Sequence, residues 1–338
     1  MKQGPLLSIC VTSYNRVNEL YRCLKSIDTI NSNDIEIVVS EDCSPKKGDI
    51  KKIVDKFKQE VEFNVVFNTN IENLGYDQNL GKLITLSTGN YLLFISDDDM
   101  FLSGGIDKLI FFLKRSNFAV AFTPYFHRKS NKMHRKYTKS FHIKRGMNGV
   151  KAHVFDSILF SGLIFRRENL STYNSEKFKN LIYSQVYLVC TQLYVNGGEY
   201  IDVAVIDCVE DGVNAFGVNA SGEKNEIMAN RSSPLSNLEY HKPLIKVIKI
   251  FDSENNENLI NSFSKQYSLR SYTGMSIARN NSIYMLKKYR QGIRGLDIRI
   301  HYISEVYFYM LMFLGVTISN FITSIPRHLL LLTRKRSG

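Results

Sequence analysis

The first 125 residues alternate short apolar runs with segments whose apolar residues recur every three or four positions. The short runs are typical of buried β-strands, and they cover residues 6–13, 35–40, 61–67, 91–96 and 119–123. Helical spacing fills the intervals between them, at residues 17–27, 50–57, 76–84 and 106–113. Strands that alternate with helices of this length predict an α/β fold with a mostly parallel sheet flanked by helices.

The pattern changes after residue 125. Residues 125–145 contain eight Lys and Arg residues and no acid, which predicts a long surface loop, either solvated or anion-binding. Strand character returns at 160–165 and 200–206, with a helix over 180–195 between them. The Asn-, Gly- and Ser-rich residues 212–238 predict a loop or hinge, and only helical patterns follow beyond about residue 240.

Composition restricts the class of protein. The chain has 338 residues, of which 44% are hydrophobic and 22% charged, and this excludes a mostly disordered chain, a collagen-like repeat and a polytopic membrane protein. Five scattered cysteines without a CxxC pair argue against a disulfide framework or a zinc site and favour a reducing cytosol. We find no signal-peptide pattern at the N-terminus and therefore expect a cytoplasmic protein.

The formal net charge of +12 is concentrated near the C-terminus. Residues 265–338 hold twelve Lys and Arg residues against two acids, so the preceding part is nearly neutral. Within this region, residues 306–326 carry no charge and are long enough to cross a bilayer, which takes about 20 residues. Five Thr, Ser and Asn side chains lower the hydrophobicity of that run. Amphipathic helices over 300–338 that lie on an anionic membrane surface are therefore favoured. The alternatives are a buried bundle helix with a basic tail and a transmembrane span.

Polar clusters follow three of the predicted strands. Residues 12–16 (TSYNR) follow the first, Glu41 and Asp42 the second, and the aspartates at 97–99 the strand YLLFIS. Ligands of open α/β sheets bind beyond the carboxyl ends of the strands, so these clusters are candidates for one site. Three adjacent carboxylates repel each other unless a cation neutralises them, and hard divalent cations prefer oxygen ligands.

Four ordered motifs give this part of the chain a family resemblance. They are SICVTSYNR at 8–16, EIVVSEDCS at 36–44, NLGYDQN at 73–79 and STGNYLLFISDDD at 87–99. Together they resemble the family-2 nucleotide-sugar glycosyltransferases, continuously over residues 6–115. The resemblance implies a GT-A fold, a Rossmann-like sheet flanked by helices, that binds a nucleoside-diphosphate sugar.

The same resemblance assigns roles to individual residues. It places in the nucleotide-sugar pocket Thr12, Tyr14, Arg16, Glu41, Asp42, Asn73, Gly75, Asn79 and Asp97. It also implies a Mg²⁺ or Mn²⁺ ion, held with the donor diphosphate by Asp97, Asp98 and Asp99. By this likeness residues 1–125 form the nucleotide-sugar-binding half and residues 126–220 the acceptor-binding half. Residues 221–338 form a helical C-terminal region.

The chain departs from the family at the general base. Many relatives open a helix of the second half with an acidic pair, and here that place is taken by Ser184 and Gln185. Inverting transfer needs a base near the acceptor hydroxyl. The remaining candidates are Asp156, Glu210 and Asp211. A base in an unusual position, a retaining mechanism and a different local alignment stay open.

From these observations we expect a peripheral enzyme at the cytoplasmic face of the inner membrane. It would transfer a hexose or deoxyhexose to a polyprenyl-diphosphate-linked oligosaccharide during bacterial capsule or O-antigen synthesis, with a homodimer as a further possibility. One alternative is a sugar nucleotidyltransferase, although TSYNR is not a glycine-rich phosphate loop. The other is a non-catalytic basic module that binds membrane or nucleic acid. We expect no nucleic-acid partner, because the aromatic residues of 302–321 lie in an uncharged run.

Overall fold

The computed structural model describes residues 4–209, 211 and 233–335. The chain divides into two compact units. Unit 1 comprises residues 1–224 and 253–255, and unit 2 comprises residues 225–252 and 256–338. The strands lie in unit 1, whereas the described part of unit 2 is helical.

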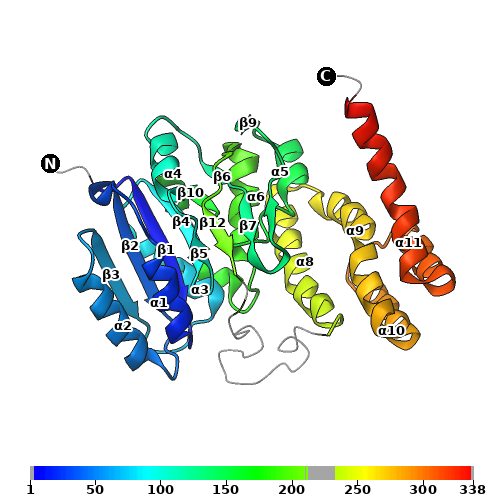
Figure 1. Cartoon of the computed structure of the whole chain (residues 1–338), viewed down its shortest axis with the longest axis horizontal. Coiled ribbons are helices and arrows are strands. Elements are labelled where there is room, and N and C mark those ends of the chain that lie inside the picture. Colours follow the sequence, from blue (N-terminus) through cyan, green and yellow to red (C-terminus); the bar gives the residue numbers. More distant parts are fainter. Residues whose placement is uncertain (1–3, 210, 212–232, 336–338) are drawn as a thin grey trace. The chain divides into compact units, whose positions relative to one another are not determined.

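An eight-stranded sheet forms the centre of unit 1 (Figure 1). Its strands are, in spatial order, β3 (Asn64–Thr69), β2 (Ile35–Glu41), β1 (Leu7–Ser13), β4 (Tyr91–Ser96), β10 (Ile164–Arg166), β6 (Val120–Phe122), β11 (Gly198–Tyr200) and β9 (Phe141–Ile143). The first four strands are parallel, as predicted. Beyond β4 the sheet is mixed, because β10 runs antiparallel to both of its neighbours.

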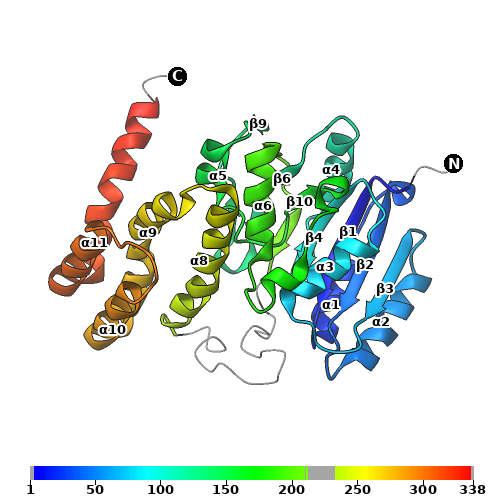
Figure 2. The same ribbon diagram turned by 180° about the vertical axis from the view of Figure 1, so that it is seen from behind.

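Helices cover both faces of this sheet because its strands are apolar on both sides. Ile9, Ile37 and Leu93 lie in register and belong to the core under α1 (Val17–Lys25), α2 (Lys47–Gln59) and α4 (Gly105–Leu113). Figure 2 shows α3 (Tyr76–Leu86) and α6 (Ser184–Val195) on the face opposite α1 and α2. The short helix α5 (Met147–His153) packs against α6.

A second, four-stranded sheet corrects the prediction of a long loop over 125–145. It consists of β5 (Met100–Phe101), β12 (Ile206–Cys208), β7 (Tyr125–His127) and β8 (Lys132–His134). The basic segment therefore contributes β7 and β8 here and β9 to the large sheet. β7 and β8 pair with each other, whereas β12 and β11, which pair with β7 and β9, are distant in the sequence. Each of these strands is only three residues long, which explains why the local pattern does not reveal them. The predicted strand 200–206 is likewise divided between β11 and β12.

Several bases of the same segment form ion pairs within unit 1. Asp207, Asp202 and Asp156 are the partners of Arg128, Arg135 and Lys136, respectively. These three cations are therefore compensated by acids of the protein itself. Short 3₁₀ turns complete unit 1, at Ser32–Asp34, Arg128–Ser130, Arg167–Leu170 and Ser175–Phe178.

Four helices make up the described part of the C-terminal region, and their bounds are α8 (Ser236–Asn255), α9 (Leu259–Asn281), α10 (Ile283–Arg294) and α11 (Ile303–Lys335). The helical pattern predicted beyond residue 240 is thus confirmed. Phe263, Leu286 and Leu311, from three of these helices, are fully buried. Of the predicted loop 212–238, residues 212–232 lie outside the described residues.

Candidate active site

The register of three parallel strands brings the polar clusters together. Ser13 at the end of β1 lies beside Glu41 of β2, and Thr12 lies beside Ser96 of β4. The amide of Asp42 also donates to the Ser13 carbonyl over 3.0 Å. The predicted meeting of residues 12–16, 41–44 and 97–99 at one sheet edge is therefore confirmed.

Two residues at this edge have left-handed backbone conformations although neither is a glycine. Asn15, which follows β1, has φ 60°, and Cys43, which follows β2, has φ 54°. Such conformations are uncommon for residues with a Cβ, and they concentrate at sites where the surrounding structure imposes them. The chain thus turns sharply at two adjacent strand ends.

Asp97 is buried directly beside Arg16. One carboxylate oxygen of Asp97 accepts from the Arg16 guanidinium at 2.7 Å, and the other accepts from the Tyr14 amide at 3.2 Å. The same Arg16 nitrogen lies 3.2 Å from a carboxylate oxygen of Asp98. Arg16 thus neutralises part of the charge of the aspartate run with a cation from the motif after β1.

Asp99 is held by two elements distant in the sequence. Its carboxylate accepts from the Ser161 hydroxyl at 2.6 Å and from the Val209 amide at 3.0 Å. Burial raises the pKa of Asp99 to about 6, although the Ser161 hydroxyl opposes that shift. Burial likewise raises the pKa of Asp97 to about 7 against the opposing effect of Arg16. The neighbouring charge of Asp98 raises the pKa of both groups.

Asp42 organises the turn before α3. Its carboxylate accepts from the amides of Leu74 and Gly75, both at 2.8 Å, and from the Asn70 side chain at 2.9 Å. Gly75 begins the helix with φ 78° and ψ 168°, a conformation that is essentially restricted to glycine. Its amide is also 3.0 Å from Oδ1 of Asn73. Asp42, Asn73 and Gly75 therefore form one connected turn.

The side chains of Glu41 and Asn79 are buried next to the strand ends. Glu41 is fully buried, and its Oε1 accepts from the Ser44 amide at 2.8 Å. Its Oε2 has no hydrogen-bond partner among the described residues, and burial raises the pKa of Glu41. The Asn79 side chain exchanges hydrogen bonds with Ser40 and accepts one from Asn70. Asn79 therefore supports the strand ends from within the protein, whereas Thr12 and Tyr14 are half-buried.

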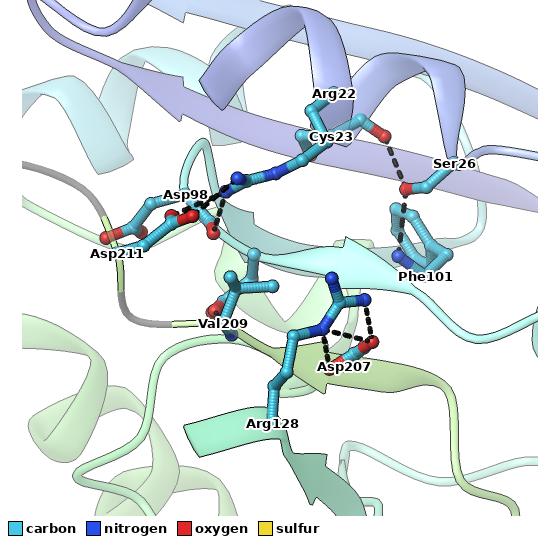
Figure 3. A network of polar contacts seen from close by, with 10 residues as sticks. Arg22, Cys23, Ser26, Asp98, Phe101, Arg128, Asp207, Val209 and Asp211 are labelled. Atoms are coloured by element: carbon cyan, nitrogen blue, oxygen red, sulfur yellow. Dashed lines mark hydrogen bonds and ion pairs between the residues drawn. The ribbon is translucent and has the colours of Figure 1, made fainter. Parts of the chain in front are cut away.

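The three base candidates have different surroundings. Asp211 forms a bidentate ion pair with Arg22 at 2.6 Å, and Arg22 also donates to the Asp98 carbonyl at 3.1 Å (Figure 3). The hydrogen bonds from Arg22 lower the pKa of Asp211. Asp156 instead accepts from His153 at 2.8 Å and from Lys136 at 2.7 Å. Glu210 lies outside the described residues. Of the candidates described, Asp211 is thus the one joined to the aspartate run.

The position of the missing acidic pair is the buried N-terminus of α6. Asp77 of α3 accepts from the amides of Leu181, Ile182 and Ser184, at 3.1, 2.7 and 3.0 Å. Gln185 accepts from the Tyr76 hydroxyl at 3.1 Å and donates to the carbonyl of Ile158. A carboxylate therefore lies at the start of α6, but it is the side chain of Asp77 on α3, and its oxygens accept hydrogen bonds from backbone amides.

Sequence reasoning missed four residues of this arrangement, namely Arg22, Asn70, Asp77 and Ser161. Asp77 lies inside the quoted motif NLGYDQN, and Ser161 lies in the strand predicted at 160–165, so these two segments were the available signal. Arg22 and Asn70 carry no comparable signal, because only the fold brings them to the strand ends.

The aspartate run suits a divalent cation that is shared with a substrate. Asp97, Asp98 and Asp99 are nearly fully buried, and Arg16 alone does not balance three carboxylates. Within the described residues, no group of three or more His, Cys, Asp or Glu side chains encloses a metal position. Mg²⁺ commonly uses one or two protein carboxylates together with substrate phosphates.

Comparison with known proteins places the site in a family. Residues 8–174 match the family described as Glycosyl transferase family 2. Over these residues the chain is similar to family 2 glycosyl transferases. The matched region contains every site residue from Thr12 to Ser161, whereas α6, β12 and Asp211 follow it.

Similar curated proteins include two named bacterial transferases. The GalNAc(5)-diNAcBac-PP-undecaprenol beta-1,3-glucosyltransferase of Campylobacter jejuni is 30% identical over 106 residues, which are 31% of this chain and 34% of that protein. The abequosyltransferase RfbV of Salmonella typhimurium is 30% identical over 96 residues, 28% of each chain. The chain thus spans about one third of the length of the curated relatives it matches.

Solved structures show the fold. Staphylococcus aureus TarS 1-349 in complex with UDP-GlcNAc has a TM-score of 0.51 and 13% identity over 90% of both chains. The mannosyltransferase PcManGT of Pyrobaculum calidifontis, in complex with GDP-Man and Mn²⁺, has the same TM-score and identity over 87% of this chain and 75% of that one. The expected GT-A fold is therefore confirmed.

Proposed function

We propose that the chain transfers a sugar from a nucleoside-diphosphate sugar to a hydroxyl of a lipid-linked saccharide in surface polysaccharide synthesis. The observation that carries this proposal is the meeting of Arg16, Asp42 and Asp97–Asp99 at one edge of a family 2 sheet. The named relatives support the acceptor class, since the Campylobacter jejuni protein bears undecaprenol in its name and the Salmonella protein is an abequosyltransferase.

The donor would bind across the ends of β1, β2 and β4. Asp42 offers acceptor oxygens to a base or ribose, whereas the fully buried Glu41 holds the turn at Ser44 beside it. Asp97 is kept in place for a ribose hydroxyl by Arg16 and the Tyr14 amide. Asp98 and Asp99 would hold the Mg²⁺ or Mn²⁺ ion. When bound, that ion supplies positive charge to the leaving diphosphate.

Residues from outside the family region would complete the reaction site. Asp211 is the proposed general base, which accepts the proton of the attacking acceptor hydroxyl as the bond between sugar and phosphate breaks. Arg22 positions the Asp211 carboxylate with two hydrogen bonds of 2.6 Å. The Asp211 carboxylate is ionised at neutral pH, as a general base requires; Arg22 lowers its pKa further, so the contribution of Arg22 is to orient the carboxylate and not to strengthen it as a base.

The location proposed for the enzyme is the cytoplasmic face of the inner membrane. A lipid-linked acceptor is confined to a bilayer, so an enzyme that extends it must work at that surface. The twelve basic residues of 265–338 support contact with anionic headgroups.

A thermal-shift screen of nucleoside diphosphates with and without Mn²⁺ tests the proposal. We expect one nucleotide to raise the melting temperature only when Mn²⁺ is present, and Asp98→Asn to abolish that shift. Asp55→Asn, which alters an exposed carboxylate of α2, serves as the matched control and should keep it. A metal-independent shift that survives Asp98→Asn would contradict the proposed site. Transfer of labelled sugar to lipid-linked acceptors then tests the reaction.

A further inference from the structure

The apolar run of α11 is interrupted in its middle. Residues 303–324 contain an 18-residue window with a mean hydropathy of 1.6, and this helix is by length and composition alone sufficient to cross a membrane. Gly315, however, has φ 70° and ψ −178°, so the helix stops and restarts there (Figure 1). The twelve residues of 303–314 reach about 18 Å as a helix, and a bilayer core is about 30 Å thick. The part of α11 before the break is therefore too short to cross a bilayer by itself.

One side of α11 is fixed to α9 on both sides of this break. Before it, the hydroxyls of Ser271 and Ser304 are 2.9 Å apart, and Arg279 donates to the Leu311 carbonyl at 3.0 Å. After it, the Tyr272 hydroxyl donates to Oδ1 of Asn320 at 2.7 Å. The helix α9 carries exposed charged residues at Lys265 and Arg270 and cannot enter the hydrocarbon core. A helix attached to it from Ser304 to Asn320 therefore stays outside that core as well.

The other side of α11 exposes a stripe of apolar side chains. We define the α11 stripe by its exposed members, which are Tyr302, Val306, Tyr309, Phe313, Leu314, Ile318, Phe321 and Ile322. Tyr302 directly precedes α11, and on each side of the break at Gly315 the other members recur every three or four residues, so they lie along one face of each half of the helix. Phe313 and Phe321 are 78% and 69% exposed, respectively. A soluble surface seldom presents so long an apolar patch unless something covers it.

The charge of the surrounding region indicates which partner covers the α11 stripe. Twelve basic residues against two acids over 265–338 make this region strongly positive, and exposed Lys287 and Lys288 lie on α10. The Lys288 ammonium is 4.8 Å from the centre of the exposed Tyr284 ring. A second copy of the chain would bring the same positive charge against itself, which is repulsive. An anionic lipid surface supplies both apolar cover and opposite charge.

We propose that α11 lies in the plane of an anionic membrane and inserts the α11 stripe between the headgroups without spanning the bilayer. The aromatic and aliphatic side chains enter the interfacial layer, and the basic residues of unit 2 contact the headgroups. This proposal deepens the membrane location proposed above. It does not depend on glycosyl transfer, so vesicle binding and nucleotide binding can fail separately.

Co-sedimentation of the full chain with vesicles tests the inference. We expect binding to mixed phosphatidylcholine–phosphatidylglycerol vesicles that weakens with salt, and much weaker binding to phosphatidylcholine alone. The double variant Phe313→Ser/Phe321→Ser should bind at least about tenfold more weakly, because two large apolar side chains no longer enter the lipid. The matched control is Phe111→Ser on α4, which changes a 63% exposed phenylalanine of unit 1 and should bind normally.

Two further measurements distinguish the alternatives. Alkaline carbonate should release the wild-type chain from membranes, whereas retention in the pellet would show a span and overturn the proposal. Light scattering without lipid should not detect an oligomer that the wild-type chain forms and the double variant does not form. Such an oligomer, combined with absent vesicle binding, would assign the α11 stripe to a second copy instead. Circular dichroism and the Mn²⁺-dependent nucleotide shift, both expected to be unchanged in the double variant, show that the variant is folded.

Discussion

Arg16 illustrates how a single residue affects the charge and the pKa values of the site. Its guanidinium, next to Asp97 and Asp98, is a cation that the protein itself supplies to a buried acidic run. Burial lowers the pKa of Arg16, but the two aspartates more than offset that effect and the net shift is upward. Because this cation does not balance three carboxylates, burial still leaves the pKa values of Asp97 and Asp99 raised.

The raised pKa of Asp99 predicts a pH dependence of folding stability without metal. The pKa of this carboxyl group is about 3.8 in the unfolded chain and about 6 in the folded protein, so the folded state holds the proton more tightly. Its stabilising contribution is complete below the lower value and is lost as pH rises through the higher one. Urea unfolding in EDTA should therefore show a smaller loss of stability over this range for Asp99→Asn than for wild type. Equal slopes for both proteins would contradict the assignment.

The proposed base predicts a selective loss of turnover. Asp211→Asn should lower kcat by about 100-fold or more while KM for the donor changes little, because the amide cannot accept the acceptor proton. Asp156→Asn is the comparison, since Asp156 is engaged by Lys136 and His153 and is not joined to the aspartate run. Steady-state kinetics of both variants decide between the two carboxylates. A larger loss of kcat for Asp156→Asn would reverse the assignment.

At the scale of elements, Asp77 connects two helices that are distant in the sequence. It lies in the first turn of α3, yet its carboxylate receives three amides from the start of α6. The turn before α6 contains two residues with positive φ, Asn180 at 65° and Ile182 at 55°. A strained turn of this kind persists only when other contacts hold it, and Asp77 supplies them.

Replacing Asp77 should destabilise the protein through this turn. Asp77→Ala leaves three amides without their acceptor, and we expect a loss of about 2–3 kcal/mol in the free energy of unfolding. Asp77→Asn keeps one carbonyl oxygen and should lose less. Asp55→Ala, on the exposed surface of α2, should cost less than about 0.5 kcal/mol. Chemical denaturation measures all three, and an Asp77→Ala loss as small as that of Asp55→Ala would refute the capping role.

At the scale of the whole molecule, the proposed roles are divided between two compact units. The nucleotide site lies in unit 1, and the α11 stripe lies in unit 2. Each unit has buried apolar residues of its own, for example Phe94 in unit 1 and Phe263 in unit 2. Donor recognition and membrane contact are therefore built from separate sets of residues.

This division predicts two calorimetric unfolding transitions. A nucleoside diphosphate with Mn²⁺ should raise the midpoint of the unit 1 transition, because a ligand stabilises the folded part that binds it. The midpoint of the unit 2 transition should stay unchanged. Phe313→Ser/Phe321→Ser should leave both midpoints close to those of wild type, since both side chains are exposed. One single transition that moves as a whole would show that the units unfold together.

Much of unit 1 was predictable because its signals are local. Short apolar runs and period-3.6 patterns reported the strands β1 to β4 and the helices between them, and the polar clusters follow directly after β1, β2 and β4. The basic segment 125–145 was wrongly predicted as a loop. Its strands are only three residues long and are stabilised by β11 and β12, which come much later in the chain.

The sequence by itself determined the class of fold, the sheet edge that carries the site and the uneven charge of the chain. It could do so because parallel strands place their carboxyl ends at a common edge and because charge is a property of composition. Only the tertiary structure decided that Asp211 reaches Arg22, that Asp99 is held by Ser161 and that α11 breaks at Gly315. Those outcomes depend on contacts between distant residues and on one backbone angle, and a linear pattern contains neither.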